Sequence, residues 1–244
     1  MSSITFSKML VDNFTGIDFD GASFAGQNVK QTYGTASTTI DVEFSWAGDV
    51  SIDSIAIPAI SQSTGLSFDL VFKNSGGSTI IAPATISQTV EAFPRGTSHQ
   101  LLEFTQVDLV RTIELQITGV TGDIVFGGFY PYLTSVTPSY NFQNGATFQQ
   151  NTERRIVESQ TFSYGRYISK LRTFNLPFKL LTDTDINSLS QFDAQVGDFP
   201  VLVRLDPDEL TAQQWIVGNM NIGQVTIANV NELSANIVEL RAWQ

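Results

Sequence analysis

One short segment of this chain has the pattern of an α-helix, and most of the sequence around it has the pattern of β-strands. Thr182 and Asp185, three residues apart, match a capping box at a helix N-terminus, and Gly197 is placed to end the helix. Between them, apolar residues recur at spacings of three, three and four, which fits one side of a 3.6-residue period. These residues are Ile186, Leu189, Phe192 and Val196. The sequence therefore predicts a helix near 183–196.

The segments on both sides of this helix are strand-like. Arg172–Leu181 and Pro200–Leu205 are rich in residues that suit a half-buried pleated surface. The whole chain is rich in Thr, Ser, Val, Ile and Phe, and its 18 Gly and 8 Pro favour short strands joined by turns. The composition predicts an all-β protein in which the helix is an exception.

The first half of the chain contains a series of predicted strands. In Thr38–Trp46, apolar residues alternate with polar ones, so we expect one buried and one exposed face. Apolar residues on both faces of Val50–Pro58 indicate a bulge or a strand covered on both sides. Further strands are predicted at Leu66–Phe72, before the turn Asn74–Gly77, and at Arg111–Thr118 and Thr121–Phe129.

At 244 residues the chain is long enough for two domains, each with its own core. Thr134–Thr152 is polar and contains Pro138 and Asn144-Gly145, which is typical of a connecting segment. We therefore predict two β-sandwich domains, 1–135 and 153–244, joined by a linker at 136–152.

The charge of the chain is negative and unevenly distributed. Thirteen basic and 24 acidic residues give −11, of which residues 1–135 contribute −8 (5 minus 13) and residues 136–244 contribute −3 (8 minus 11). Nucleic acid is a poor partner for either half, because phosphate binding depends on clustered Lys and Arg. The basic residues that gather where the second half begins are Arg154, Arg155, Arg166, Lys170 and Arg172. They are either solvated charges on strand faces or contacts to acidic groups of a neighbouring subunit.

The chain has no cysteine, so it has neither a disulfide nor a thiolate metal site. No apolar run reaches the roughly 18 residues that a membrane-spanning helix needs, and Met1–Leu10 lacks the pattern of a cleaved signal. We expect a soluble protein made in a reducing cytosol, with no membrane insertion.

Candidates for catalysis or metal binding are few. His99, the one histidine, lies in a loop-like stretch that we interpret as a surface turn, and a single His cannot complete a multi-His metal site. Asp18 and Asp20 resemble part of a calcium loop, with a hydrogen-bonded turn as the alternative. The three carboxylates of Asp206–Glu209 lie on one predicted turn, not on opposite sides of a substrate. We assign no catalytic residue, no cofactor and no metal, and we expect no enzymatic activity.

The strands of residues 30–133 resemble a known fold in their order and spacing. Trp46, the segments VSIDSIAIP, LSFDLVF and RTIELQIT, and the final DIVFGGFYPY resemble the galactose-binding-like jelly roll of carbohydrate-binding modules and of several phage tail proteins. The resemblance implies a jelly-roll-like sandwich in the first half of the chain.

The second half resembles the tail-tube-type β-sandwich of long-tailed bacteriophages. The resemblance is carried by FSYGRY with a Tyr-Gly turn, LPFKLL, the helix, GDFPVLVRLDPDE and the late Trp215–Gly218 strand. In distal tail proteins and related tail-tip components this fold forms rings. The resemblance implies a virion protein of the tail tip or baseplate, assembled in the host cytoplasm with copies of itself and other tail proteins.

Aromatic residues near the end of the first half offer a second class of function. Phe129, Tyr130 and Tyr132 have rings suited to stacking on sugar faces, or to covering the joint between the two halves. The alternative to a structural tail protein is therefore a carbohydrate-binding or adhesion module that recognises a host surface glycan.

Overall fold

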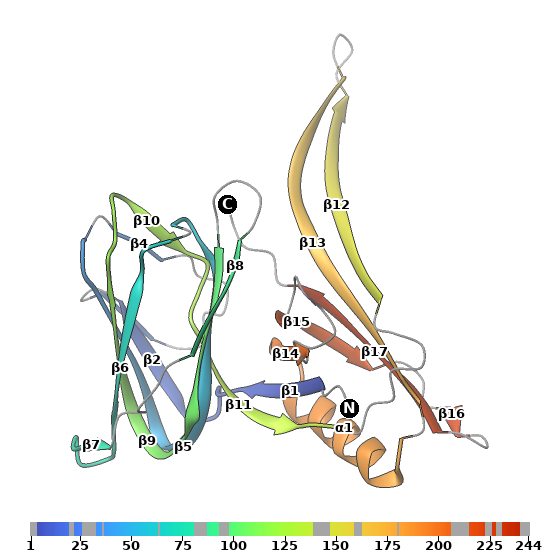
Figure 1. Ribbon diagram of the computed structural model, residues 1–244, viewed down its shortest axis with the longest axis horizontal. Coiled ribbons are helices and arrows are strands. Elements are labelled where there is room, and N and C mark those ends of the chain that lie inside the picture. The colour runs from blue at the N-terminus through green and yellow to red at the C-terminus, as the bar shows by residue number, and fades with distance from the viewer. Residues whose placement is uncertain are drawn as a thin grey trace. The chain divides into compact units, whose positions relative to one another are not determined.

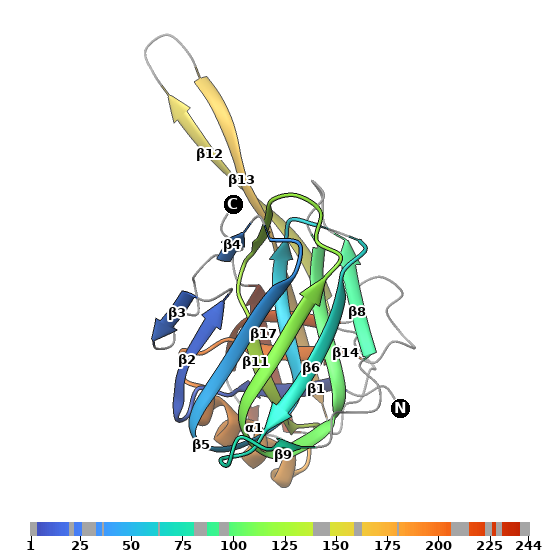
Figure 2. The ribbon, with the colours of Figure 1, turned by 90° about the vertical axis from the view of Figure 1, so that its left-hand side faces the viewer.

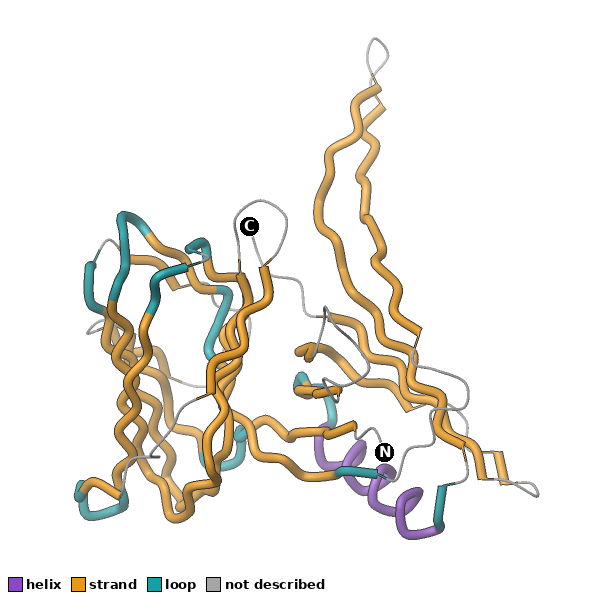
Figure 3. Tube along the Cα trace, in the orientation of Figure 1, coloured by secondary structure: helices purple, strands orange, loops and turns teal. Residues whose placement is uncertain are grey.

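The computed structural model describes most of the chain. The described residues are 4–19, 22–25, 33–35, 37–62, 64–80, 87–92, 98–138, 147–158, 163–179, 181–205, 215–222, 226–227 and 231–239. They form an all-β fold in which one helix accompanies many strands (Figures 1 and 3).

The elements, in chain order, are as follows. The strands before the helix are β1 (Ile4–Met9), β2 (Phe14–Phe19), β3 (Ala22–Ala25), β4 (Tyr33–Thr35), β5 (Ile40–Ile60), β6 (Ser67–Lys73), β7 (Thr79–Ile80), β8 (Ser87–Ala92), β9 (Ser98–Thr118), β10 (Ile124–Phe126), β11 (Tyr130–Val136), β12 (Thr147–Glu158) and β13 (Ser163–Lys179). The helix α1 (Asp183–Val196) is followed by β14 (Val201–Leu205), β15 (Trp215–Ile222), β16 (Thr226–Ile227) and β17 (Asn231–Glu239).

Contacts within the chain define two compact units. The first combines Met1–Lys8 with Ser135–Arg241 and is called the helix unit, and the second contains Met9–Thr134 and is called the sandwich unit. The contacts therefore group the first strand, β1, with the second half of the chain, whereas the predicted boundary kept residues 1–135 together. That the two halves of the chain fold as independent domains remains a prediction.

Two long strands organise the sandwich unit. β5 and β9 have 21 residues each and pair antiparallel, with register shifts between Ser45 and Ser54 of β5. On one side of these shifts, β2 flanks β5 and β6 flanks β9. On the other side, β11 flanks β5 and β8 flanks β9. The shifts mark bulges, which bend paired strands, so β5 and β9 contribute to both layers of a β-sandwich-like fold.

The core of the sandwich unit lies between the two parts of β5 and β9. Val42 and Leu115 from one part and Ile57 and Leu102 from the other belong to the same buried cluster. Near the register shifts, Leu109 has φ of 59°, and its side chain is 64% exposed. A left-handed backbone is unfavourable for a residue with a Cβ, so the backbone at Leu109 is strained.

All strand pairs that the structure describes in the helix unit are antiparallel. β13 pairs with β17, β17 with β15, β15 with β14, and β14 with the N-terminal strand β1. β12 pairs with β13 from Thr147, opposite Asn175, to Glu158, opposite Ser163. β17 pairs with β13 only from Thr173 onward. Ser163–Arg172 and residues 150–158 of β12 thus form a two-stranded ribbon, called the arm here, which extends beyond the other strands of this unit (Figure 1).

The helix α1 covers one face of this sheet, as its sequence predicts. The Thr182 hydroxyl accepts from the Asp185 amide at 3.1 Å, and the Asp185 carboxylate accepts from the Thr182 amide at 3.1 Å, which confirms the capping box. Gly197 ends the helix with φ of 55°, a backbone that glycine adopts without strain. The buried residues of the helix are Leu189, Phe192 and Val196. They pack in one cluster with alternate residues of β1, β13, β14 and β17.

Three local predictions differ from the structure. Tyr164 and Gly165 lie within β13, so the predicted Tyr-Gly turn is wrong. Residues 147–152 of the predicted linker form the start of β12. His99 lies in β9 with 6% exposure, not in an exposed turn. In each case strand pairing outweighs the local turn signal, and for Tyr164 and Gly165 the partner is the preceding strand β12.

Candidate functional site

The most distinctive polar surface of the described residues is the outer face of the sheet β2-β5-β9-β6. Alternate residues of these strands point to opposite faces, and the inward residues fill the sandwich core. The outward residues include the carboxylates Asp18, Asp41, Glu43, Asp69 and Glu114. We call these five residues and Gln116 the acidic face. Figure 2 shows the four strands side by side, with this sheet turned toward the viewer.

The strand register brings these carboxylates into rows. Asp18 on β2 lies directly opposite Glu43 on β5, and Glu43 lies directly opposite Glu114 on β9. In the next row, Gln116 on β9 lies between Asp41 on β5 and Asp69 on β6. Neighbouring strands are about 5 Å apart, so the first row places three carboxylates across about 10 Å.

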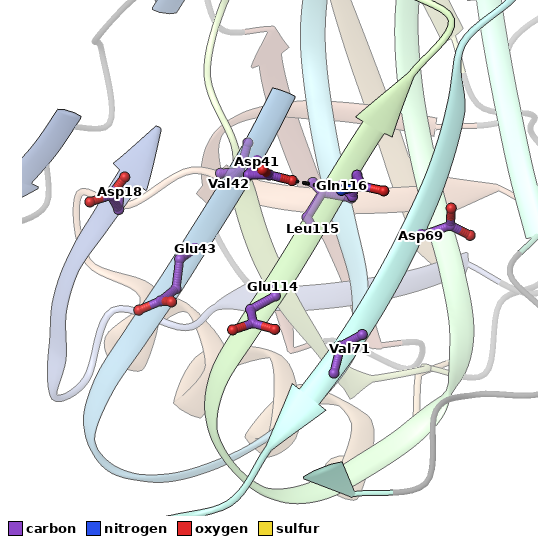
Figure 4. A pocket seen from close by; sticks show the side chains of 9 residues that line it. All are labelled: Asp18, Asp41, Val42, Glu43, Asp69, Val71, Glu114, Leu115 and Gln116. Atoms are coloured by element: carbon purple, nitrogen blue, oxygen red, sulfur yellow. Dashed lines mark hydrogen bonds between the residues drawn. The ribbon is translucent and has the colours of Figure 1, made fainter. Parts of the chain in front are cut away.

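The acidic face surrounds a shallow depression of about 490 Å³, also lined by Val42, Val71 and Leu115 (Figure 4). Gln116 Nε2 donates a hydrogen bond of 2.9 Å to Asp41 Oδ1. Lys73, near the end of β6, pairs with Glu114. Among the described residues, none of those that line the depression is basic. Its chemistry is that of an anionic surface with one amide.

The carboxylates of the acidic face repel one another when no cationic partner is bound. Like charges directly opposite one another on adjacent strands destabilise a sheet, and Glu43 has a carboxylate opposite it on both sides. Asp41, Glu43 and Asp69 are exposed, so water screens part of the repulsion. A cationic partner would convert the repulsion into attraction.

The described residues contain no group of His, Asp and Glu arranged to hold a metal ion. Asp18 is part of the acidic face, and Asp20 lies outside the described residues. The Asp206–Glu209 segment is also outside them. Buried His99 is opposite Glu91 of β8 in the strand register.

The predicted basic cluster lies on the arm. Arg154 and Arg155 are on β12, and Arg166, Lys170 and Arg172 are on β13, so all five lie on the arm. Arg155 is directly opposite Arg166, Thr152 is opposite Lys170, and Gln150 is opposite Arg172. The backbone thus gathers residues that are up to 18 positions apart in the sequence.

The three candidate aromatic residues are buried. Phe129 is 7% exposed and packs in the sandwich core, with its ring centroid 5.1 Å from that of Phe126 and 5.8 Å from that of Phe19. Tyr130 and Tyr132 are 3% and 0% exposed. Burial raises the pKa of the Tyr132 hydroxyl well above its ordinary value, and the neighbouring Tyr130 adds to the effect. These buried rings present no open face on which a sugar could stack.

Sequence reasoning missed the acidic face. The alternation in Thr38–Trp46 places Asp41 and Glu43 on the exposed side of one strand, and the structure confirms their exposure. The partners Asp18, Glu114 and Asp69 are 23 to 73 positions away from them in the chain. The register that aligns strands so far apart is set by the packing of their inner faces, which no local pattern encodes.

No protein-family model matches this sequence, and no curated protein matches it at a significant level. The one helix of the described residues, α1, has 14 residues and is too short to cross a membrane, and the described chain contains no other candidate.

Proposed function

We propose that this chain is a structural component of the tail tip or baseplate of a long-tailed bacteriophage, and that it works by assembling with copies of itself and with other tail proteins. The observation that carries the proposal is the arm, a ribbon in which Ser163–Arg172 pairs, among the strands that the structure describes, with β12 alone. Two-stranded ribbons are marginally stable alone in water, and open strand edges invite pairing with another chain. An arm of this kind fits an assembly in which another subunit covers it.

The sequence resemblance supports the same proposal. The helix and its flanking strands, which resemble the tail-tube-type fold, lie together in the helix unit with a common core. The patterns that resemble a galactose-binding-like jelly roll lie in the β-sandwich-like unit. In this proposal the protein is part of the virion, is assembled in the host cytoplasm, and acts without catalysis.

The test is incorporation into particles. The double variant Arg154→Glu/Arg155→Glu should fold normally and be depleted from purified tails, because it reverses the charge of the arm. A matched control reverses two basic residues of the other half, Lys30→Glu/Arg95→Glu, with the same change in net charge. Normal incorporation of the arm variant would show that the arm is not the assembly surface.

The alternative function is binding of a host surface glycan by the sandwich unit. The depression on the acidic face favours it, since carboxylates and an amide can accept and donate hydrogen bonds to sugar hydroxyls. Calorimetric titration with host surface glycans tests it. Heat of binding that is lost in Gln116→Ala, and kept in a variant of the exposed Asp123, would favour this alternative over a purely structural role.

A further inference from the structure

We propose that the arm of one copy of this protein docks on the acidic face of a second copy. The inference deepens the proposed function, because it requires copies of the chain to meet, and it names the two surfaces that would join them. It depends on the strand register and the charge of both surfaces.

The arm concentrates positive charge in an otherwise acidic protein. It contains five of the 13 basic residues of the chain but only two acidic ones, Glu153 and Glu158, so its net charge is +3. The register places Arg155 directly opposite Arg166. An anionic partner would balance the net charge of the arm and would add contacts that a two-stranded ribbon lacks.

The acidic face has the complementary features. It gathers five carboxylates on four adjacent strands, and its first row also contains directly opposed like charges, Asp18 with Glu43 and Glu43 with Glu114. Lys73 pairs with Glu114, so the excess negative charge of this face comes from Asp18, Asp41, Glu43 and Asp69. Docking would place the excess positive charge of the arm beside these carboxylates.

The spacings of the two surfaces are compatible. Carboxylates in a row of the acidic face come from strands about 5 Å apart, and the two strands of the arm have the same separation. Along each strand, residues on one face recur at about 7 Å, which applies to Lys170 and Arg172 as well as to Asp41 and Glu43. The cations on one face of the arm can therefore meet carboxylates in one arrangement, which is how charge fixes register between subunits.

The test uses two full-length variants with opposite charge reversals. The arm variant is Arg154→Glu/Arg155→Glu, and the face variant is Glu43→Lys/Asp69→Lys, whose two positions are exposed. Asp123→Lys/Asp198→Lys, at exposed turn positions outside the acidic face, is the control with the same change in net charge as the face variant. Circular dichroism verifies that each variant is folded, and sedimentation velocity at about 0.05 M and about 0.5 M salt measures association.

We expect the native protein to associate at low salt and to dissociate at high salt. The arm variant and the face variant should each lose self-association by about tenfold or more, and the control should keep it. The decisive sample is an equimolar mixture of the two variants, since an acidic arm then meets a basic face. Association in the mixture, with neither variant associating alone, supports docking between copies.

Three results would overturn the inference: a native protein that stays monomeric at low salt, a control as defective as the face variant, or a mixture that fails to associate. The proposed function is judged separately, by incorporation into particles. Copies that dock in solution but are missing from virions would contradict that function and leave the docking intact. Copies present in virions with no association in the mixture would contradict the docking alone.

Discussion

Replacing Phe192 by alanine tests the packing of the helix unit most sharply. The Phe192 side chain is 2% exposed, and its ring centroid is 5.9 Å from that of Phe6, which is fully buried on β1. Removing a buried phenylalanine ring costs about 3–5 kcal/mol, from lost transfer free energy and the cavity left behind. We expect the upper half of this range, because Phe6 loses one of its two aromatic partners at the same time and keeps Phe178.

The assay is urea denaturation followed by the fluorescence of Trp215, which is 1% exposed in the helix unit. Trp46 and Trp243 are replaced by Phe in the reference protein, so that the fluorescence comes from Trp215 alone and follows the unfolding of the helix unit. Gln191→Ala is the matched control, since Gln191 is exposed beside Phe192, and it should change the free energy of unfolding by less than about 0.5 kcal/mol.

A double-mutant cycle isolates the contact between the helix and the N-terminal strand. Phe6→Leu and Phe192→Leu should be coupled by about 0.5–1.5 kcal/mol, the range for aromatic pairs. Equal losses for Phe192→Ala and Gln191→Ala would refute the assignment of the buried face. Zero coupling would refute the packing of β1 under the helix.

Four further outcomes are expected. Thr182→Ala should cost about 1 kcal/mol in the same urea assay because it removes the helix cap, and Thr182→Ser should cost little. Leu109→Gly should stabilise the protein by about 0.5–1 kcal/mol in thermal denaturation, since it relieves a left-handed backbone, and Leu109→Ala should bring no gain. Hydrogen bonds from Ser51 and Gln106 lower the pKa of the Asp108 carboxyl, so any stability this group adds is present above its ordinary pKa and lost as pH falls through the lowered value. Titration by NMR should show this lowered midpoint, and Ser51→Ala should raise it; an unchanged midpoint would contradict the assignment. Proteolysis between β11 and β12, within 137–146, should give two fragments that stay together on a sizing column until denatured, because β1 of the first pairs with β14 of the second.

The elements with strong local signals were predictable from the sequence. The helix bounds follow from its cap, its apolar spacing and Gly197, all of which the structure confirms. The inward and outward residues of Thr38–Trp46 follow from simple alternation, and Ile40, Val42, Phe44 and Trp46 are buried as expected. Val50–Pro58 has both predicted features, since β5 shifts register there and Ser54–Ile57 are all buried. These signals depend only on residues close together in the chain.

The features that need long-range pairing were not predictable in this way. Nothing in Ile4–Met9 indicates that its partner is β14, some 200 residues later, because alternating Ile4 and Phe6 would fit any sheet. The acidic face depends on the relative register of four strands that are far apart in the chain. Turn signals at Tyr164-Gly165 were misleading because strand pairing fixes the backbone there. Local patterns thus predict the individual helix and strands, whereas packing determines which strands pair.

The most direct test of the proposed function is to locate the native protein on phage particles. Antibody labelling of purified virions, viewed by electron microscopy and combined with quantitative mass spectrometry, measures both position and copy number. The proposal predicts several copies per particle, confined to the tail tip. Particles that lack the protein altogether, or that hold it only in trace amounts, would contradict its role as a structural tail component.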